Sequence, residues 1–380
     1  MRGRSSPSGR RTALIEASLC LLALAFALPP GTAIAAATQR SGRAPTDCSW
    51  SVVADTTHSL SGTLQSVDAL SASDAWAVGS VQMPRRALPL AEHWNGKRWT
   101  AVPTPVDGRH VRVLHDVLAL APDDVWAVGA QILVKTGSVH TLVEHWNGTQ
   151  WSIVPVPHAR SNHEELLAIS GGSSSNLWAV GYLEPAVTPM PLAMHWNGSK
   201  WHVVRPPAGG TLQDVSGHEP GGVWTVGTSA PGIRQALIAM RDRAGWRVDA
   251  DTPAQDLEAM TWRRATDAWA VGDAPASAPI YLQPLAMHWN GSSWTAARTP
   301  VLQNPAELRG VAAISPDVAW AVGTLDFTHP LILRWDGTAW RLVAPPTSDG
   351  YLDGIARVPG SHELWAVGNG APDPLILRYC

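Results

Sequence analysis

Asp74-Ala75-Trp76-Ala77-Val78-Gly79, followed by His93-Trp94-Asn95-Gly96, is the stretch from which the fold can be predicted. About fifty residues later the same phrase returns as Asp124-Val125-Trp126-Ala127-Val128-Gly129 with His145-Trp146-Asn147-Gly148, and it keeps returning to the C-terminus. A fixed period of roughly 20 to 50 residues indicates a solenoid, a propeller or another repeat array. The repeat is therefore the unit from which the architecture must be built.

Each repeat predicts four short strands. An apolar strand such as 64–70 is followed by a turn and by a second strand that carries Trp-Ala-Val-Gly or Trp-Thr-Val-Gly. A variable loop leads to a third strand, and Asn-Gly then turns the chain into a fourth, because both residues tolerate the positive φ of a tight hairpin. The second-strand Trp occurs seven times, as Trp76, Trp126, Trp178, Trp224, Trp269, Trp320 and Trp365.

The fourth strands are out of phase with the other three. The first Trp-led fourth strand, at Trp50, has no strands before it, and the last repeat ends at 375–380 without a fourth strand. If the N-terminal strand completes the last sheet, the array closes into a ring and leaves no terminal edge exposed. We therefore predict an all-β fold over 48–380, a seven-bladed β-propeller of four-stranded antiparallel blades, in which 48–57 and 350–380 form the closing blade.

The cysteines give a separate reason to expect closure. Alignment of the repeats puts Cys48 and Cys380 in the turn that joins the third strand to the fourth, within reach of each other. Two cysteines in a secreted chain favour a disulfide, which here would fasten the ring where the covalent chain is interrupted.

The N-terminus has the pattern of a secretory signal. Arg10 and Arg11 precede an apolar run at about 19–28, and Ala33-Ile34-Ala35 forms a small-residue cleavage site. We expect residues 1–36 to be a signal peptide that is cleaved after Ala35 or within the next two residues, and 37–47 to be a disordered linker. No other apolar run is long enough to span a membrane. The expected location is extracellular.

The charge distribution argues against one class of partner. Residues 1–43 carry a net charge of +5, so the rest of the chain carries −8 within the total of −3. A body this acidic is a poor binder of phosphate backbones, so nucleic acid is excluded as the partner. A monomer is expected.

The pattern of Trp-Ala-Val-Gly, a variable loop, His-Trp-Asn-Gly and Trp-x-x-Val-Pro resembles the kelch and galactose-oxidase type of β-propeller, especially its secreted bacterial repeat proteins. The resemblance covers Cys48 to Cys380. It implies the propeller fold but not the copper-radical oxidase activity, which needs a Tyr crosslinked to a Cys. Here the two cysteines of the expected mature chain lie at the closure point.

Several repeated residues have a structural and a functional interpretation. The Trp pairs, such as Trp94 with Trp99, fit a sugar-stacking array or the packing between blades, and we expect packing. The aspartates two residues before the second-strand Trp fit turns better than calcium sites. Four histidines occupy one equivalent position on different blades, too far apart to share an ion whose ligands lie about 2 Å away: His93, His145, His195 and His288. No metal site, no cofactor and no catalytic motif is predicted, so catalysis is the less favoured interpretation.

The candidate site is the mouth of the central channel, which the first strands line in propellers of this kind. Polar residues at the starts of these strands differ from blade to blade, as expected of a site built on a repeating frame: Gln65, His115, Asp116, Glu164, Glu165, Asp214, Glu258, Arg309 and Asp353. We predict a non-catalytic binding scaffold whose partner is a protein or a cell-envelope glycan. The alternatives are a carbohydrate-binding module and a polysaccharide hydrolase or lyase that uses two of these carboxylates.

Overall fold

The computed structural model describes residues 48–380 apart from 54–60, 84–85, 160, 186–187, 207–209, 218–221, 231–232, 250–255, 276–281 and 371–372. The signal peptide expected at 1–36 and the linker expected at 37–47 lie outside the described residues. Within the described part of the chain, no helix has the length and apolar character needed to cross a membrane.

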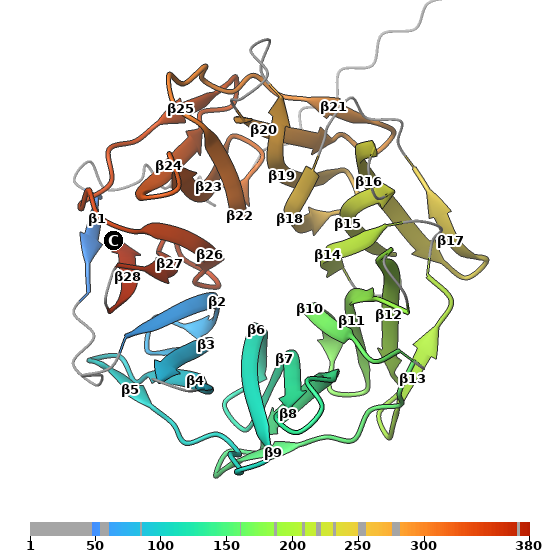
Figure 1. Cartoon of the computed structure of the whole chain (residues 1–380). Coiled ribbons are helices and arrows are strands. Elements are labelled where there is room, and N and C mark those ends of the chain that lie inside the picture. The colour runs from blue at the N-terminus through green and yellow to red at the C-terminus, as the bar shows by residue number, and fades with distance from the viewer. Residues whose placement is uncertain are drawn as a thin grey trace, which may run out of the picture. The chain divides into compact units, whose positions relative to one another are not determined.

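Seven four-stranded antiparallel sheets stand around a central channel, so the predicted fold is confirmed (Figure 1). The first three blades are built from β2 (Gly62–Ser71), β3 (Asp74–Met83), β4 (Arg86–Trp94) and β5 (Trp99–Ala101), then β6 (His110–Ala121), β7 (Asp124–Leu133), β8 (Val139–Trp146) and β9 (Trp151–Ile153), then β10 (Glu164–Ser173), β11 (Asn176–Leu183), β12 (Met190–Trp196) and β13 (Trp201–Val204). Their first strands, β2, β6 and β10, line the channel.

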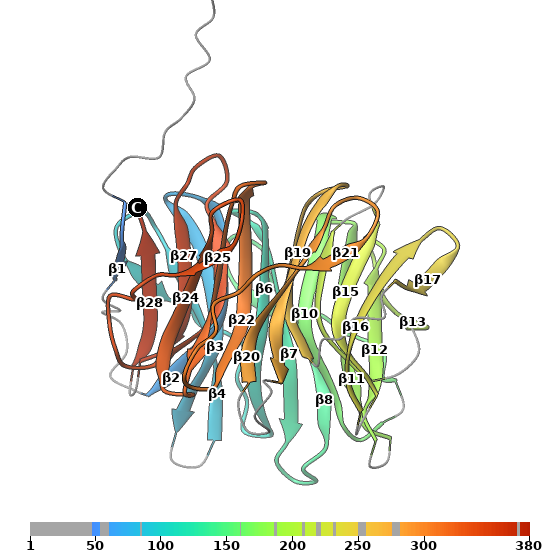
Figure 2. The same cartoon turned by 90° about the horizontal axis from the view of Figure 1, so that it is seen from above.

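The next three blades repeat the order. They are built from β14 (Thr211–Gly217), β15 (Val223–Ala230), β16 (Ile233–Asp242) and β17 (Gly245–Val248), then β18 (Asp256–Arg264), β19 (Asp267–Pro275), β20 (Leu282–Trp289) and β21 (Trp294–Ala296), then β22 (Ala306–Ser315), β23 (Val318–Leu325), β24 (His329–Trp335) and β25 (Trp340–Leu342). β7 and β11 end at the same edge of the ring (Figure 2).

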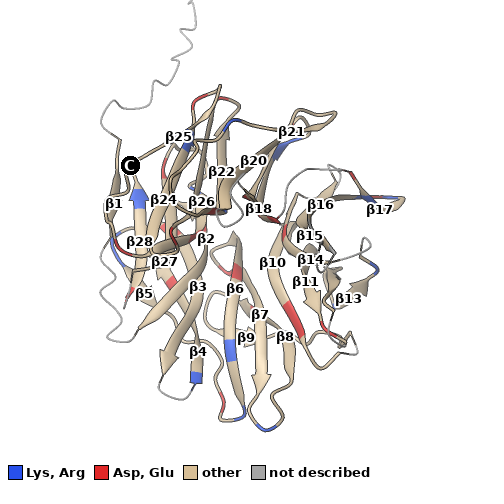
Figure 3. Cartoon of the chain, turned by 45° about the horizontal axis from the view of Figure 1, so that its top comes forward, with Lys and Arg blue, Asp and Glu red and all other residues tan. Residues whose placement is uncertain are grey.

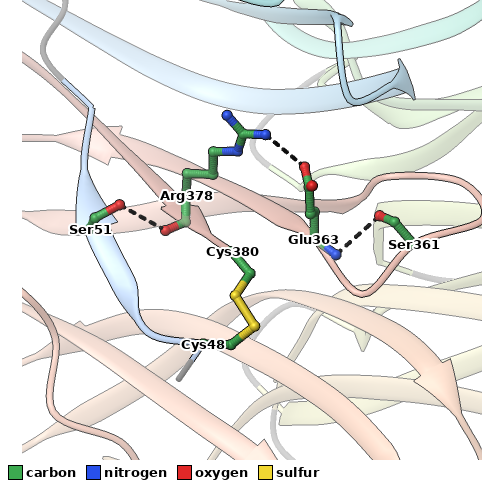
Figure 4. The surroundings of a disulfide bond; sticks show 6 residues. All are labelled: Cys48, Ser51, Ser361, Glu363, Arg378 and Cys380. Atoms are coloured by element: carbon green, nitrogen blue, oxygen red, sulfur yellow. Dashed lines mark hydrogen bonds and ion pairs between the residues drawn. A yellow bond between two sulfur atoms is a disulfide. The ribbon is translucent and has the colours of Figure 1, made fainter. Parts of the chain in front are cut away.

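The last blade combines both ends of the described chain. It contains β26 (Tyr351–Arg357), β27 (Leu364–Asn369), β28 (Pro374–Tyr379) and β1 (Trp50–Val52). Trp50 is paired with Tyr379 and Val52 with Leu377 in the antiparallel register. Cys48 and Cys380 form a disulfide beside this pair, with their Cα atoms 5.1 Å apart (Figure 4).

The tryptophans fill the interfaces between blades. The ring of Trp76, on the second strand of its blade, lies 5.1 Å from that of Trp146 and 5.4 Å from that of Trp151 on the next blade. The same contact closes the ring, since Trp365 of the last blade packs on Trp94 and Trp99. The packing interpretation of the Trp pairs therefore accounts for these residues.

The repeated histidines have structural partners. His93 Nε2 lies 2.9 Å from Asp74 Oδ1, and its ring packs on Trp76 at 4.6 Å between centroids. The equivalent His145 lies 2.8 Å from Asp124 Oδ1 and packs on Trp126 at 4.4 Å. Each histidine thus connects the third strand of its blade to the second, as expected of a structural contact.

Candidate binding site at the channel mouth

A β-bulge recurs at the same place in the first strand of every blade. In the blade of β2 and β3, the register shifts between Leu64 and Ser66, so Gln65 is the extra residue. Such a bulge re-aims one side chain. The extra residues of the seven blades line one cavity of about 480 Å³ at the channel mouth: Gln65, His115, Leu167, Gln213, Glu258, Arg309 and Asp353. We call this set the mouth ring.

A glycine next to each bulge lets the strands approach. A Cβ on Gly79 would collide with the carbonyl oxygen of Thr63 on the neighbouring strand, and one on Gly129 would collide with that of Val113. This is the last residue of the Trp-Ala-Val-Gly motif. The Trp-Ala-Val-Gly motif, from which the fold is predicted, therefore has a second role. Its glycine lets the first and second strands approach closely next to each mouth-ring residue.

Asp116 and Asp214 were predicted at the mouth, but their carboxylates are used to connect blades. Asp116 accepts hydrogen bonds from its neighbour Val117 N at 2.9 Å and from Ile169 N of the next blade at 2.7 Å. Asp214 likewise accepts from Met260 N of the next blade at 2.7 Å. Both line the channel, one residue beyond the mouth ring. Burial raises the pKa of Asp116, and it raises that of Asp214 to about 8.

Glu164 does not face the channel as the sequence predicted. Successive side chains of a strand point to opposite sides, so only one of the two adjacent glutamates can turn inward. Glu164 is fully buried on the other side of β10, where its Oε1 accepts a hydrogen bond from Ser161 N at 2.8 Å. Figure 3 shows acidic residues on the channel-lining strands β6 and β10.

Glu165 lies beside the mouth ring in a network of polar side chains. Its carboxylate lies 2.8 Å from His163 Nε2 and 3.5 Å from His115 Nε2. His115 Nδ1 in turn lies 2.5 Å from Gln65 Oε1. Burial acts to raise the pKa of Glu165, but hydrogen bonds from the two histidines and their charges outweigh it and lower the pKa. Glu165 therefore stays ionised.

The opposite side of the mouth carries an arginine between two carboxylates. Arg309 lies 3.0 Å from Asp353 Oδ1 and 3.1 Å from Glu307 Oε2, and its guanidinium lies 5.1 Å from the centre of the Tyr351 ring. Beside them, burial, together with the charges on Asp256 and Glu307, raises the pKa of Glu258 to about 7. The mouth thus has more carboxylates than cations.

Sequence reasoning missed Gln213 and Leu167 of the mouth ring and the neighbouring Tyr351. A signal for the first two exists, since each follows the buried Leu that opens a first strand, as Gln65 follows Leu64. Strict alternation of inward and outward side chains along a strand does not distinguish the residue after this Leu. The β-bulge, which the sequence does not reveal, makes that residue face the mouth.

Comparisons with known proteins identify the fold. No family model matches the sequence, and no curated protein matches it. Among solved structures, YCF48 bound to a D1 peptide is 13% identical with a TM-score of 0.58, over 87% of this chain and 96% of that one. YCF48 from Cyanidioschyzon merolae is 15% identical with a TM-score of 0.56, over 87% and 98%.

Two further neighbours come from other classes of propeller. The WD40 β-propeller domain of Doa1 is 10% identical with a TM-score of 0.58, over 87% of this chain and 97% of that one. An ulvan lyase from a family of polysaccharide lyases, bound to GlcA(1-4)Rha3S, is 9% identical with a TM-score of 0.52, over 83% and 96%. At these identities the likeness concerns the fold alone. The kelch or galactose-oxidase repeat type is not confirmed, whereas YCF48 and the WD40 domain of Doa1 are neighbours of this fold.

Proposed function

We propose that this protein is a secreted, non-catalytic binding protein that holds a cationic segment of a partner protein at its channel mouth. The observation that carries the proposal is the mouth ring. Residues that build the blades repeat around the ring, whereas the seven bulged residues comprise five different polar types and one leucine. A position that is structurally identical but chemically varied in every blade is suited to contact a ligand rather than to support the fold.

Charge supports a cationic ligand. Glu165 and Asp353 lie at or beside the mouth, with Asp256 and Glu307 next to them and Arg309 facing them. Glu258, with a pKa of about 7, adds negative charge to the extent that it is ionised. A channel mouth with an excess of negative charge raises the local concentration of cationic ligands. The glutamines Gln65 and Gln213 provide amides that can pair with a peptide backbone.

The peptide-bound YCF48 structure shows that a propeller of this shape accepts a peptide, which is consistent with the proposal. The partner is expected outside the cell if residues 1–36 act as the predicted secretion signal. The cell-envelope glycan that the sequence also suggested has less support at the mouth. The one Trp outside the repeat positions, Trp262, stacks on Trp224 at 5.6 Å instead of standing free for a sugar.

The test compares two double variants on an array of peptides and polysaccharides. Glu258→Gln with Asp353→Asn removes two mouth carboxylates, and Asp123→Asn with Asp317→Asn removes two exposed carboxylates from turns between first and second strands. We expect the wild type and the turn variant to bind Lys- and Arg-rich peptides and the mouth variant to lose most of this binding. Equal binding by both variants would place the interaction elsewhere, and binding of glycans alone would favour the second candidate.

The second candidate is a polysaccharide hydrolase or lyase. One observation favours it: Glu258, with a pKa of about 7, holds its proton in about half of the molecules near neutral pH, beside the charges of Asp256 and Glu307. That division of roles is what a general acid and its partner require. Turnover of a polysaccharide panel that disappears in Glu258→Gln would establish this activity, and the absence of turnover by the wild type would exclude it for that panel.

A further inference from the structure

A group of potential metal ligands lies on the far side of β10 from the channel. His140 is on β8, His158 is in the loop before β10, and Glu164 is the first residue of β10. One donor atom of each lies within 4.8 Å of the other two. The rings of His140 and His158 are 4.9 Å apart between centroids, and His158 Nδ1 is 4.0 Å from Glu164 Oε2.

Two polar atoms of this group are buried without a hydrogen-bond partner among the described residues. They are Oε2 of Glu164, whose side chain is 0% exposed, and Nδ1 of His140. A buried carboxylate oxygen or imidazole nitrogen that lacks a partner costs free energy. The other carboxylate oxygen, Oε1, is held by Ser161 N, so Oε2 is fixed in its direction.

An ion pair between His158 and Glu164 does not account for the arrangement. At 4.0 Å their atoms are beyond hydrogen-bond distance, and the pair would leave His140 Nδ1 without a partner. A cation placed among the three residues would give Glu164 Oε2 a partner and would be bound by one ring nitrogen of each histidine.

The donor set selects the kind of cation. Two imidazole nitrogens and one carboxylate oxygen form a His₂Glu set, which binds Zn²⁺ and leaves a fourth position open, whereas Mg²⁺ and Ca²⁺ prefer oxygen ligands alone. Tetrahedral Zn²⁺ needs its ligand atoms about 3.3 Å apart, so atoms that lie up to 4.8 Å apart must approach by up to about 1.5 Å. His158 is 65% exposed and lies in a loop, so it can make this movement.

The backbone holds the ligand-bearing segments together. Val139, next to His140, donates a hydrogen bond from its N to Asn162 O at 2.9 Å and forms a parallel bridge with His163. Ser161 Oγ donates to the carbonyl oxygen of Glu184 at 2.7 Å. The start of β8 and the segment before β10 are therefore already aligned, which lowers the entropic cost of binding a metal.

We propose that His140, His158 and Glu164 form a Zn²⁺ site that fastens the loop before β10 to β8, at the interface of the second and third blades. The site is separate from the mouth ring, and its existence does not depend on the proposed binding function. His158, at 65% exposed, is the ligand through which the site meets solvent.

The experiment measures Zn²⁺ binding by calorimetry to the purified, untagged protein after treatment with EDTA, and Co²⁺ binding by visible absorption. We expect one ion per chain. His158→Ala should weaken binding by at least about 100-fold, since loss of an outer-shell partner alone costs 10- to 100-fold. Glu164→Gln should weaken it similarly. His362→Ala, which removes another exposed histidine, should leave the affinity unchanged.

His158→Ala is the decisive variant, because an exposed loop side chain can be removed without affecting the fold, as circular dichroism can verify. The proposal is overturned if the wild type takes up no stoichiometric Zn²⁺, or if His158→Ala and His362→Ala bind it equally well. Failure of the peptide-binding test at the mouth would leave this result unaffected.

Discussion

Glu164 and Glu165 are adjacent in the chain, yet their carboxylates face different environments on the two sides of β10. Glu164 Oε2 lies 4.0 Å from His158 Nδ1 at a blade interface, and Glu165 lies 2.8 Å from His163 Nε2 beside the channel mouth. The strand backbone thus separates a candidate metal site from a candidate ligand site by one peptide unit.

This separation predicts opposite effects of two similar substitutions. Glu165→Gln should weaken binding of cationic peptides, because it removes a carboxylate beside the mouth, and should leave Zn²⁺ affinity within about twofold. Glu164→Gln should do the reverse. Calorimetric titrations of both variants with Zn²⁺ and with a bound peptide check the prediction, and parallel losses in either variant would contradict it.

Glu144 should make stability depend on pH. It is fully buried on β8, neither carboxylate oxygen has a hydrogen-bond partner among the described residues, and burial raises its pKa from 4.5 to about 8, against the opposing charge of Arg112. The folded protein therefore keeps this proton up to about pH 8, while the unfolded chain loses it near pH 4.5. Stability falls as the pH rises through this window, by up to about 1.4 kcal/mol per pH unit.

Glu144→Met is the variant that isolates this effect, because Met194 and Met287 hold the same position on other blades and are buried. We expect the variant to be more stable than the wild type at pH 8 and the advantage to shrink toward pH 5. Urea unfolding at several pH values measures both curves. Parallel curves for the two proteins would show that Glu144 does not carry the predicted shift.

The blade connection through Asp116 should contribute to stability. Asp116→Ala leaves the buried amides of Val117 and Ile169 without their acceptor, and we expect a loss of about 2 kcal/mol in the free energy of unfolding, within the usual range for an unsatisfied buried group. Gln65→Ala, at the mouth ring, should change it by less than about 0.5 kcal/mol. Denaturant midpoints of the two variants distinguish a structural from a ligand-binding residue.

The disulfide should stabilise the closing blade. The Cys48→Ser, Cys380→Ser double variant is expected to unfold at a lower temperature than the wild type, because a crosslink between residues 332 apart restricts the unfolded chain. In the loop-entropy model the effect approaches about 5 kcal/mol. Thermal unfolding with and without reductant checks this. Reductant should shift the wild type and leave the double variant unchanged.

The secretion signal can be tested directly on protein exported by a bacterial host. We expect the mature protein to begin at Ala36, Ala37 or Thr38, because Ala33-Ile34-Ala35 and the alanines after it provide the small residues that signal peptidase needs. An exported protein that still begins near Met1, or one retained inside the cell, would contradict the prediction.

The repeat made the fold predictable because one aromatic side chain serves the same interface in every blade. Trp76 and its equivalents count the blades, and the unmatched fourth strand at Trp50 predicts that strands from the two ends meet. The mouth was predictable in part, since Gln65, Glu258 and Arg309 stand out as polar residues after a buried Leu. Asp116 could not be separated from them, because a carboxylate that binds backbone amides has the same sequence appearance as one that awaits a ligand.

The His140, His158 and Glu164 group could not be predicted at all. Its members come from a strand, a loop and another strand, and they do not recur in other blades. Only the three-dimensional path of the loop before β10, which pairs with β8 at Val139, brings them together. Sequence periodicity reveals the features that all blades share, whereas this group depends on a loop before β10 that belongs to one blade.

The pairing of β1 with β28 also means that the chain could begin in a different blade and still form the same ring. Since Cys48 and Cys380 have Cα atoms 5.1 Å apart, a short linker could join these positions, and new termini could be opened in a loop between any other two blades. A circularly permuted chain would then present the same mouth ring in the same order around the channel. The structure fixes the order of the blades around the ring, but it does not require any particular blade to come first in the chain.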